Sequence, residues 1–165
     1  MRSLPASRKV QSAAGLAPIL RRAASRGRRV VFTNGCFDLV HAGHVRLLER
    51  AKSYGDILVV GLNSDQPVRR LKGRGRPILP QAERALLLAA LESVDYVTIF
   101  NQATPQQLIE RLRPHVLIKG ADWAADRIVG ADLVRRWGGR IVRFPLVRGR
   151  STSAIISQIR RRRAA

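Results

Sequence analysis

The residues best suited to chemistry in this sequence lie in one stretch, VVFTNGCFDLVHAGH, which covers residues 30–44. An apolar run ends there at an Asn-Gly step, and Asp38, His41 and His44 then fall within seven residues of one another. The chain of 165 residues has only three histidines, and two of them are in this stretch. Imidazole N–H groups donate hydrogen bonds, so two of them beside a glycine-containing turn indicate a site for an anionic ligand.

The order of residues in this stretch predicts where it lies in a fold. If residues 30–33 form a strand, Gly35 and Phe37 lie at its carboxyl end, and the next helix begins near Gly43 or His44. A helix start presents unpaired amide donors and the positive end of the helix dipole, both of which suit phosphate. Gly43 would let the backbone approach a ligand closely, because it has no Cβ.

We therefore expect His41 and His44 to join those amides around a polyphosphate, while Asp38 could orient a histidine or a lysine from another loop. Two other interpretations stay open. Two histidines three residues apart on a helix can bind zinc, but no cysteine or carboxylate stands nearby at ligand spacing, so we expect no metal ligands. Each histidine could also be a packed or surface residue without a function.

Short apolar segments and helical patterns alternate along the rest of the chain. The expected strands, rich in Val and Ile, are 29–34, 56–63, 95–100, 115–120 and 139–145. The helical patterns are 44–55, 80–94, 104–114, 130–139 and 151–163. This alternation predicts an α/β fold, an open Rossmann-like sheet of about five parallel strands flanked by helices, with ligands beyond the carboxyl ends of the strands.

The domain organisation follows from the same pattern. We expect a domain over residues 29–163, preceded by a basic extension, residues 1–28, that contains a short helix over 12–25. The polar, glycine-containing stretch 64–79 has no clear periodicity and is predicted to be a long functional loop. No apolar run approaches the roughly 18 residues that a membrane span needs, so no membrane association is expected.

The formal net charge of +20 raises the question of nucleic acid. Residues 1–29 carry eight basic residues and no acidic one, and 160–163 adds four arginines, so these two segments supply 12 of the 20 charges. The remaining positive charge suits polyphosphate ligands, and nucleic acid is not the expected partner. The single cysteine, Cys36, excludes an internal disulfide and fits a cytoplasmic location.

Two familiar glycine fingerprints, the Walker A loop and the dinucleotide-binding G-x-G-x-x-G after the first strand, are absent. Instead, GCFDLVHAGH resembles the G-x-F-D-x-x-H-x-G-H signature of the cytidylyltransferase-like nucleotidyltransferases. The segment from NSDQPVRRLKG to LESVDYV, together with IKGADW and GRSTSAII, resembles the adenylyltransferase module of ADP-heptose synthases and the stand-alone heptose 1-phosphate adenylyltransferases. The resemblance covers about residues 28–160.

The resemblance implies an enzyme that transfers the adenylyl group of ATP to D-glycero-β-D-manno-heptose 1-phosphate, which gives ADP-heptose and pyrophosphate for lipopolysaccharide core or other heptose-containing glycans. It implies ATP as a substrate, Mg²⁺ accompanying the polyphosphate, and a homodimer. One alternative is a cytidylyltransferase acting on glycerol 3-phosphate or another phospho-alcohol. A second alternative, of a different class, is a basic nucleic-acid-binding module.

The resemblance also implies roles for individual residues. His41 and His44 would hold the α- and β-phosphates, and Lys72 matches the family's phosphate-binding lysine and would bridge ATP to the acceptor phosphate. Asp65 resembles a position near the acceptor. The other residues expected to bind the nucleotide are Gly35, Cys36, Phe37, Asp38, Gly43, Arg84, Lys119, Gly120, Ser151 and Thr152.

Overall fold

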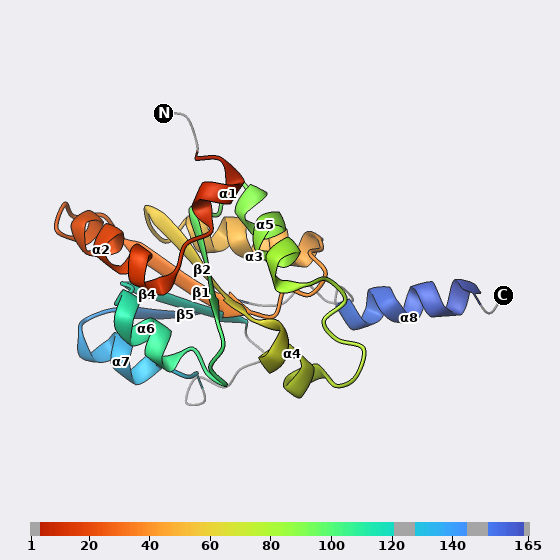
Figure 1. Ribbon diagram of the computed structural model, residues 1–165. Helices are drawn as coiled ribbons and strands as arrows, with labels where there is room; N and C mark the ends of the chain where they lie inside the picture. Colours follow the sequence, from red (N-terminus) through yellow and green to blue (C-terminus); the bar gives the residue numbers. More distant parts are fainter. Residues whose placement is uncertain (1–3, 121–127, 145–151, 164–165) are drawn as a thin grey trace.

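The computed structural model describes residues 4–120, 128–144 and 152–163, and its centre is a parallel sheet (Figure 1). The five strands are β1 (Val30–Gly35), β2 (Ile57–Asn63), β3 (Tyr96–Phe100), β4 (Val116–Gly120) and β5 (Arg140–Phe144). Their order across the sheet is β3-β2-β1-β4-β5, and every pair is parallel. Each predicted strand is confirmed to within one residue at either end, and so is the fold class.

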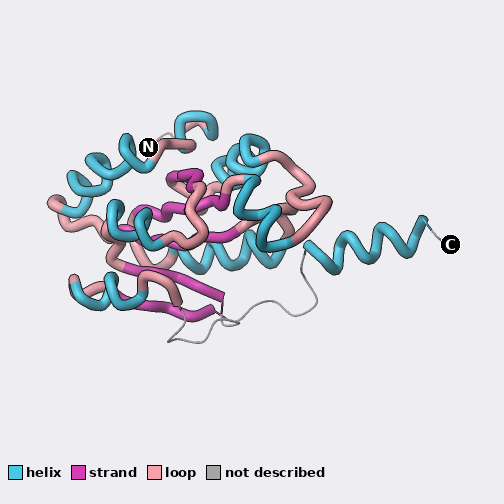
Figure 2. The backbone as a smooth tube through the Cα atoms, turned by 60° about the horizontal axis from the view of Figure 1, so that its bottom comes forward, coloured by secondary structure: helices cyan, strands magenta, loops and turns pink. Residues whose placement is uncertain are grey.

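Helices cover both faces of the sheet, because successive residues of a strand point to opposite sides. On one face, α2 (Ala13–Ala24), α6 (Gln106–Leu112) and α7 (Ala131–Arg136) pack with Val30 and Phe32 of β1 in one core cluster. On the other face, α3 (Ala42–Lys52) and α5 (Gln81–Ala90) pack with Val31 in a second cluster. The helix-sheet-helix layers are visible in Figure 2.

The amino-terminal segment packs against these layers. Ser12 caps α2, since its Oγ accepts a hydrogen bond from the Gly15 amide at 3.1 Å. The preceding short helix, α1 (Ala6–Lys9), packs against α5, and the Gln11 amide donates to the Val97 carbonyl at 2.9 Å. Lys9 is buried, and its Nζ donates to the Val94 carbonyl at 2.8 Å. The short helix predicted over residues 12–25 is therefore confirmed, and its apolar side belongs to the core.

The stretch 64–79 differs from the prediction, because its first half is helical. Residues 65–72 form α4 (Asp65–Lys72), and only residues 73–80 are a connecting loop. The last helix, α8 (Thr152–Arg163), extends away from the layered body in both views (Figures 1 and 2). Within the described residues, no helix has the length and apolar character to span a bilayer.

Candidate active site

A cavity of about 290 Å³ lies where the strand order reverses, at the carboxyl ends of the sheet. The chain runs outward from β1 through β2 to β3 and then returns to place β4 on the other side of β1. In open α/β sheets this reversal leaves a crevice in which ligands bind. The residues that line the cavity are Asn34, Gly35, Cys36, Asn63, Leu71, Lys72, Ala103, Thr104, Pro105, Lys119, Ile128 and Val129.

The two histidines lie at the start of α3, which begins at Ala42, one or two residues earlier than predicted. His41 is the residue before the helix, and its carbonyl accepts a hydrogen bond from the His44 amide at 2.8 Å. This first turn brings the two imidazole rings face to face, with centroids 3.8 Å apart and planes inclined by 19°. Gly43 lies in the same turn, so the structure brings together the three residues expected there.

The backbone of the motif bends sharply at Phe37, whose φ of 43° lies in the left-handed region that non-glycine residues rarely adopt. Its ring is buried and lies 5.0 Å from the His44 ring, centroid to centroid. A Cβ at residue 35 would lie 3.1 Å from the Phe37 ring, so Gly35 leaves room for this packing. Burial of the Phe37 ring offsets the unfavourable backbone conformation.

Burial is the main reason that the pKa of His44 falls from its usual value of 6.5 to about 4. The neighbouring His41 lowers this pKa further, because two like charges in a ring stack repel, while a backbone hydrogen bond involving Leu39 opposes the shift. The Nδ1 atom of His44 is buried without a hydrogen-bond partner in the described structure. His44 is therefore neutral at pH 7 and offers an N–H donor, whereas a nearby phosphate would favour its charged form.

Asp38 has a different partner from the one predicted. Its carboxylate is buried and accepts hydrogen bonds from the Arg76 guanidinium and from the Ile78 amide, the latter at 2.6 Å. The expectation that it would orient a histidine or a lysine is thus wrong for this structure. Asp38 instead links the loop 73–80 to the loop that follows β1 through these hydrogen bonds.

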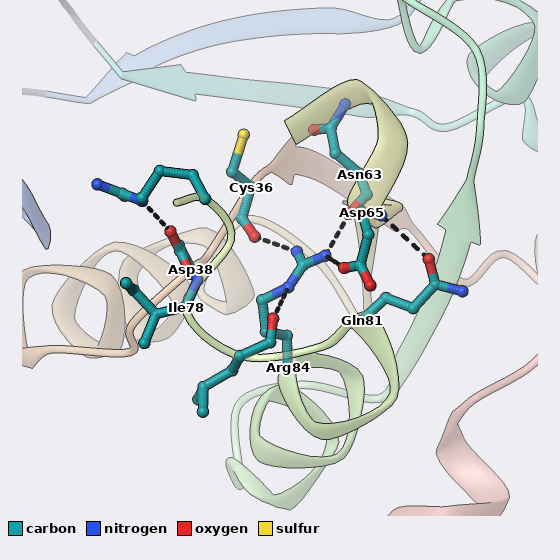
Figure 3. A network of polar contacts seen from close by, with 9 residues as sticks. Cys36, Asp38, Asn63, Asp65, Ile78, Gln81 and Arg84 are labelled. Carbon is teal, nitrogen blue, oxygen red and sulfur yellow. Dashed lines mark hydrogen bonds and ion pairs between the residues drawn. The ribbon is translucent and has the colours of Figure 1, made fainter. Parts of the chain in front are cut away.

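Arg84 is completely buried and joins four segments that surround the cavity (Figure 3). Its Nε donates to the Leu79 carbonyl, its Nη1 to the Cys36 carbonyl, and its Nη2 to both the Asn63 carbonyl and the Asp65 carboxylate. Four of its five N–H donors are therefore used within the protein. The structure gives Arg84 an organising role, and its phosphate contact stays a prediction.

Asp65, expected near the acceptor, is the first residue of α4. Its carboxylate pairs with Arg84 at 2.8 Å, and its amide donates to Gln81 Oε1 at 3.0 Å (Figure 3). Both contacts fix the start of the helix that ends at Lys72. Lys72 is exposed and lines the 290 Å³ cavity, as does a second lysine, Lys119, which precedes the last residue of β4.

The other predicted residues lie in the cavity lining, at the ends of two elements, or outside the described residues. Cys36 lines the cavity, and burial raises the pKa of its thiol against the lowering influence of Lys72 and Arg84, so the thiol stays protonated at pH 7. Gly120 ends β4, and Thr152 begins α8. Ser151 lies outside the described residues. Among the described residues, no three His, Cys, Asp or Glu side chains form a group that could hold a metal ion.

Sequence reasoning missed two asparagines and the residues that support the loops. Asn34 is the last residue but one of β1 and Asn63 is the last residue of β2. Both line the cavity, and the Asn34 Oδ1 is buried without a partner in the described structure. A polar residue at the end of an apolar run was the available signal. Nothing in the sequence near Arg76 indicated its pairing with Asp38, which is 38 residues away.

Comparisons with known proteins agree with this geometry. A family model described as cytidylyltransferase-like matches residues 32–160. The bifunctional protein HldE of Geobacter metallireducens is 54% identical over 153 residues, which are 93% of this chain and 31% of that protein. The chain thus spans about a third of the length of this relative.

Two solved structures have a similar fold. The lipopolysaccharide core biosynthesis protein from Thermoplasma volcanium is 26% identical with a TM-score of 0.64, covering 73% of this chain and 99% of that one. Pantoate-β-alanine ligase from Francisella tularensis, solved with an ATP compound and β-alanine, is 15% identical with a TM-score of 0.58, covering 87% of this chain and 68% of that one. The second likeness concerns the fold alone.

Proposed function

The chain belongs to the cytidylyltransferase-like family, and we propose that it is an adenylyltransferase that joins ATP to a sugar 1-phosphate. The acceptor we propose is D-glycero-β-D-manno-heptose 1-phosphate, and the products are ADP-heptose and pyrophosphate. Support comes from the HldE proteins, which match at about half identity, and from the lipopolysaccharide core biosynthesis protein with the same fold. These relatives do not favour a glycerol 3-phosphate enzyme or a nucleic-acid-binding module.

The observation that carries the proposal is the stacked pair of His41 and His44 at the start of α3. The loop after β1 connects this pair to a cavity that Lys72 and Lys119 line. The two histidines do not line that cavity themselves. We expect a polyphosphate to extend from the cavity to the start of α3, where N–H donors and positive charge would meet it at the end of the sheet that binds ligands.

The chemistry needs no nucleophile from the protein. An oxygen of the acceptor phosphate forms a bond to the α-phosphorus of ATP, and the bond from that phosphorus to the bridging oxygen of the β-phosphate breaks. The electron pair leaves with pyrophosphate. The protein must align the two anions and stabilise the charge that develops on the leaving group. We assign the α- and β-phosphates to His41 and His44, and the contact between ATP and acceptor to Lys72.

We expect magnesium to bind as part of the substrate MgATP. Mg²⁺ is usually held by one or two carboxylates together with substrate phosphates. Two carboxylates in the described segments that flank the cavity, those of Asp38 and Asp65, already pair with Arg76 and Arg84. The described residues thus fit a metal carried by the polyphosphate better than a resident metal site.

The fate of the α-phosphorus tests the proposal. ATP labelled at the α-phosphate should yield a labelled sugar nucleotide when heptose 1-phosphate is present, whereas label at the γ-phosphate should appear only in pyrophosphate. Label transferred from the γ-position to the acceptor would indicate a kinase and contradict the proposal. A homodimer and a cytoplasmic location remain predictions, the first of which light scattering of the purified protein can test.

A further inference from the structure

A second cavity, of about 530 Å³, lies at the opposite end of the sheet. It is formed where β1, β4 and β5 begin, and its lining includes Arg29, Arg140, His115, Tyr54 and Ser53. None of its lining residues is a carboxylate. The proposed adenylyl transfer makes no use of this cavity, because the histidine pair is at the carboxyl ends of the strands.

Two arginines beside this cavity contact the same tyrosine ring. The Arg50 and Arg140 guanidinium carbons lie 5.3 and 5.7 Å from the centroid of the Tyr54 ring, so both stack on the same aromatic side chain. A cation–π contact is not a hydrogen bond to a guanidinium N–H group, so it is compatible with a ligand that accepts from these donors. Within the described part of the chain, Arg29, Arg50 and Arg140 form no salt bridge.

His115 adds an N–H donor to the same cavity. Its Nδ1 accepts a hydrogen bond from the Val30 amide at 3.1 Å, so the neutral ring carries its proton on Nε2. That hydrogen bond also fixes the ring at the junction of β1 and β4. The cavity therefore combines full positive charges with a positioned N–H donor.

The helices of a parallel α/β fold end near this edge of the sheet, and their carboxyl ends carry partial negative charge. Each such end is equivalent to roughly half an elementary charge, and its effect fades within the last turn. Two of these ends adjoin the cavity, because Ser53 follows α3 and Gly138 lies just after α7. The Asp56 carboxylate also accepts a hydrogen bond from the Arg29 amide at 2.7 Å. Together these groups amount to about two negative charges, against the three guanidinium groups of Arg29, Arg50 and Arg140. The alternative role for these arginines is to stabilise the helix ends alone, and the two roles predict different results.

We propose that this cavity is a second anion site, which binds the phosphate group of a small phosphorylated molecule between Arg29, Arg140 and His115. Planar guanidinium groups match phosphate oxygens in geometry as well as in charge. A site of this kind, at the far end of the sheet from the histidine pair, would let a phosphorylated metabolite be sensed separately from the substrates.

The three histidines of the chain make the test direct, because each reports on one site by NMR of its ring C–H groups. Inorganic phosphate, and separately pyrophosphate, would be titrated into the whole protein at constant pH and ionic strength, with sodium chloride as the salt control. The His115 signal should shift saturably with both anions and not with chloride. Substitution of each histidine assigns the signals.

Arg140→Ala should weaken phosphate binding at the His115 signal at least about 10-fold, the loss expected for one charge-assisted hydrogen bond. The matched control is Arg26→Ala, which removes one exposed positive charge before β1 without touching the cavity, and it should leave the titration nearly unchanged. The His41 and His44 signals should respond to pyrophosphate equally in both variants, which separates this inference from the proposed function. Arg29→Ala provides a second variant if Arg140→Ala folds poorly.

Three results would overturn the proposal. The His115 signal could stay unmoved by phosphate into the tens of millimolar, or shift equally in the Arg140→Ala and Arg26→Ala proteins. Arg140→Ala could also lower the melting temperature while leaving the phosphate titration intact, in which case the arginines only stabilise the helix ends.

Discussion

Arg84 Nη2 and Asp65 Oδ1 are 2.8 Å apart, and this ion pair joins α5 to the first residue of α4. The arginine side chain is wholly buried, while the aspartate side chain is 23% exposed. Because the same guanidinium also donates to the carbonyls of Cys36, Asn63 and Leu79, one side chain sets the positions of four segments around the cavity.

Replacing this arginine should therefore destabilise the protein strongly. We expect Arg84→Met to lower the free energy of unfolding by about 3 kcal/mol, since it leaves a partly buried carboxylate and several carbonyls unpaired. Urea denaturation followed by circular dichroism measures this change. The control is Arg135→Met, which breaks the exposed pair with Asp132 and should cost less than about 1 kcal/mol. Equal costs for the two variants would refute the organising role of Arg84.

The link between Asp38 and the loop 73–80 predicts a local change. In an Asp38→Ala protein the Ile78 amide loses its acceptor, so its hydrogen exchange should speed up at least about 10-fold, consistent with the loss of one hydrogen bond to a charged group. Exchange measured by NMR or mass spectrometry would show this effect. Amides in the centre of β2 serve as internal controls, and unchanged protection at Ile78 would contradict the assignment.

Substitution of Lys72 should lower catalytic activity without lowering stability. Its side chain is exposed at the end of α4, so Lys72→Met should leave the unfolding free energy nearly unchanged. The turnover of the Lys72→Met protein should nevertheless fall by about 10- to 100-fold, the range expected for losing a charge-assisted hydrogen bond in the transition state. Arg70→Met removes an equal charge from the same helix but not from the cavity lining, and should retain activity. Similar losses in both variants would indicate a general charge effect.

The low pKa of His44 predicts how acid affects stability. The folded-state pKa of about 4 lies below the usual 6.5, so the folded state binds fewer protons than the unfolded chain. The stability that this difference contributes is complete above pH 6.5 and is lost as pH falls from 6.5 towards 4. His44→Asn should lose less unfolding free energy than the natural chain between pH 7 and pH 4.5, as measured by urea denaturation. Parallel losses would show that His44 does not titrate in this way.

Local sequence patterns predicted the strands, six of the helices and the position of the histidine pair, because these depend on apolar periodicity and on residues close together in the chain. The helix α4 was not predicted, because its sequence DQPVRRLK is polar and contains Pro67. Contacts from Gln81 and Arg84, 16 and 19 residues further on, fix its start, and no local pattern contains them.

The burial of two charged side chains could not be predicted from the sequence either. Lys9 belongs to a basic segment and Arg84 to a helix whose charged residues could all have been solvated, yet both are buried. Their positions follow from carbonyl groups that the fold places around them, at Val94 for the lysine and at Cys36, Asn63 and Leu79 for the arginine. Such sites become visible only when distant segments have been brought together.

The most direct test of the central claim is pyrophosphate release by the purified protein with Mg²⁺. ATP and CTP would each be paired with heptose 1-phosphate and with glycerol 3-phosphate, and the His44→Ala protein would be assayed alongside. We predict release only with ATP and heptose 1-phosphate, and its loss in the variant. Release with CTP and glycerol 3-phosphate alone, or undiminished release by His44→Ala, would contradict the account.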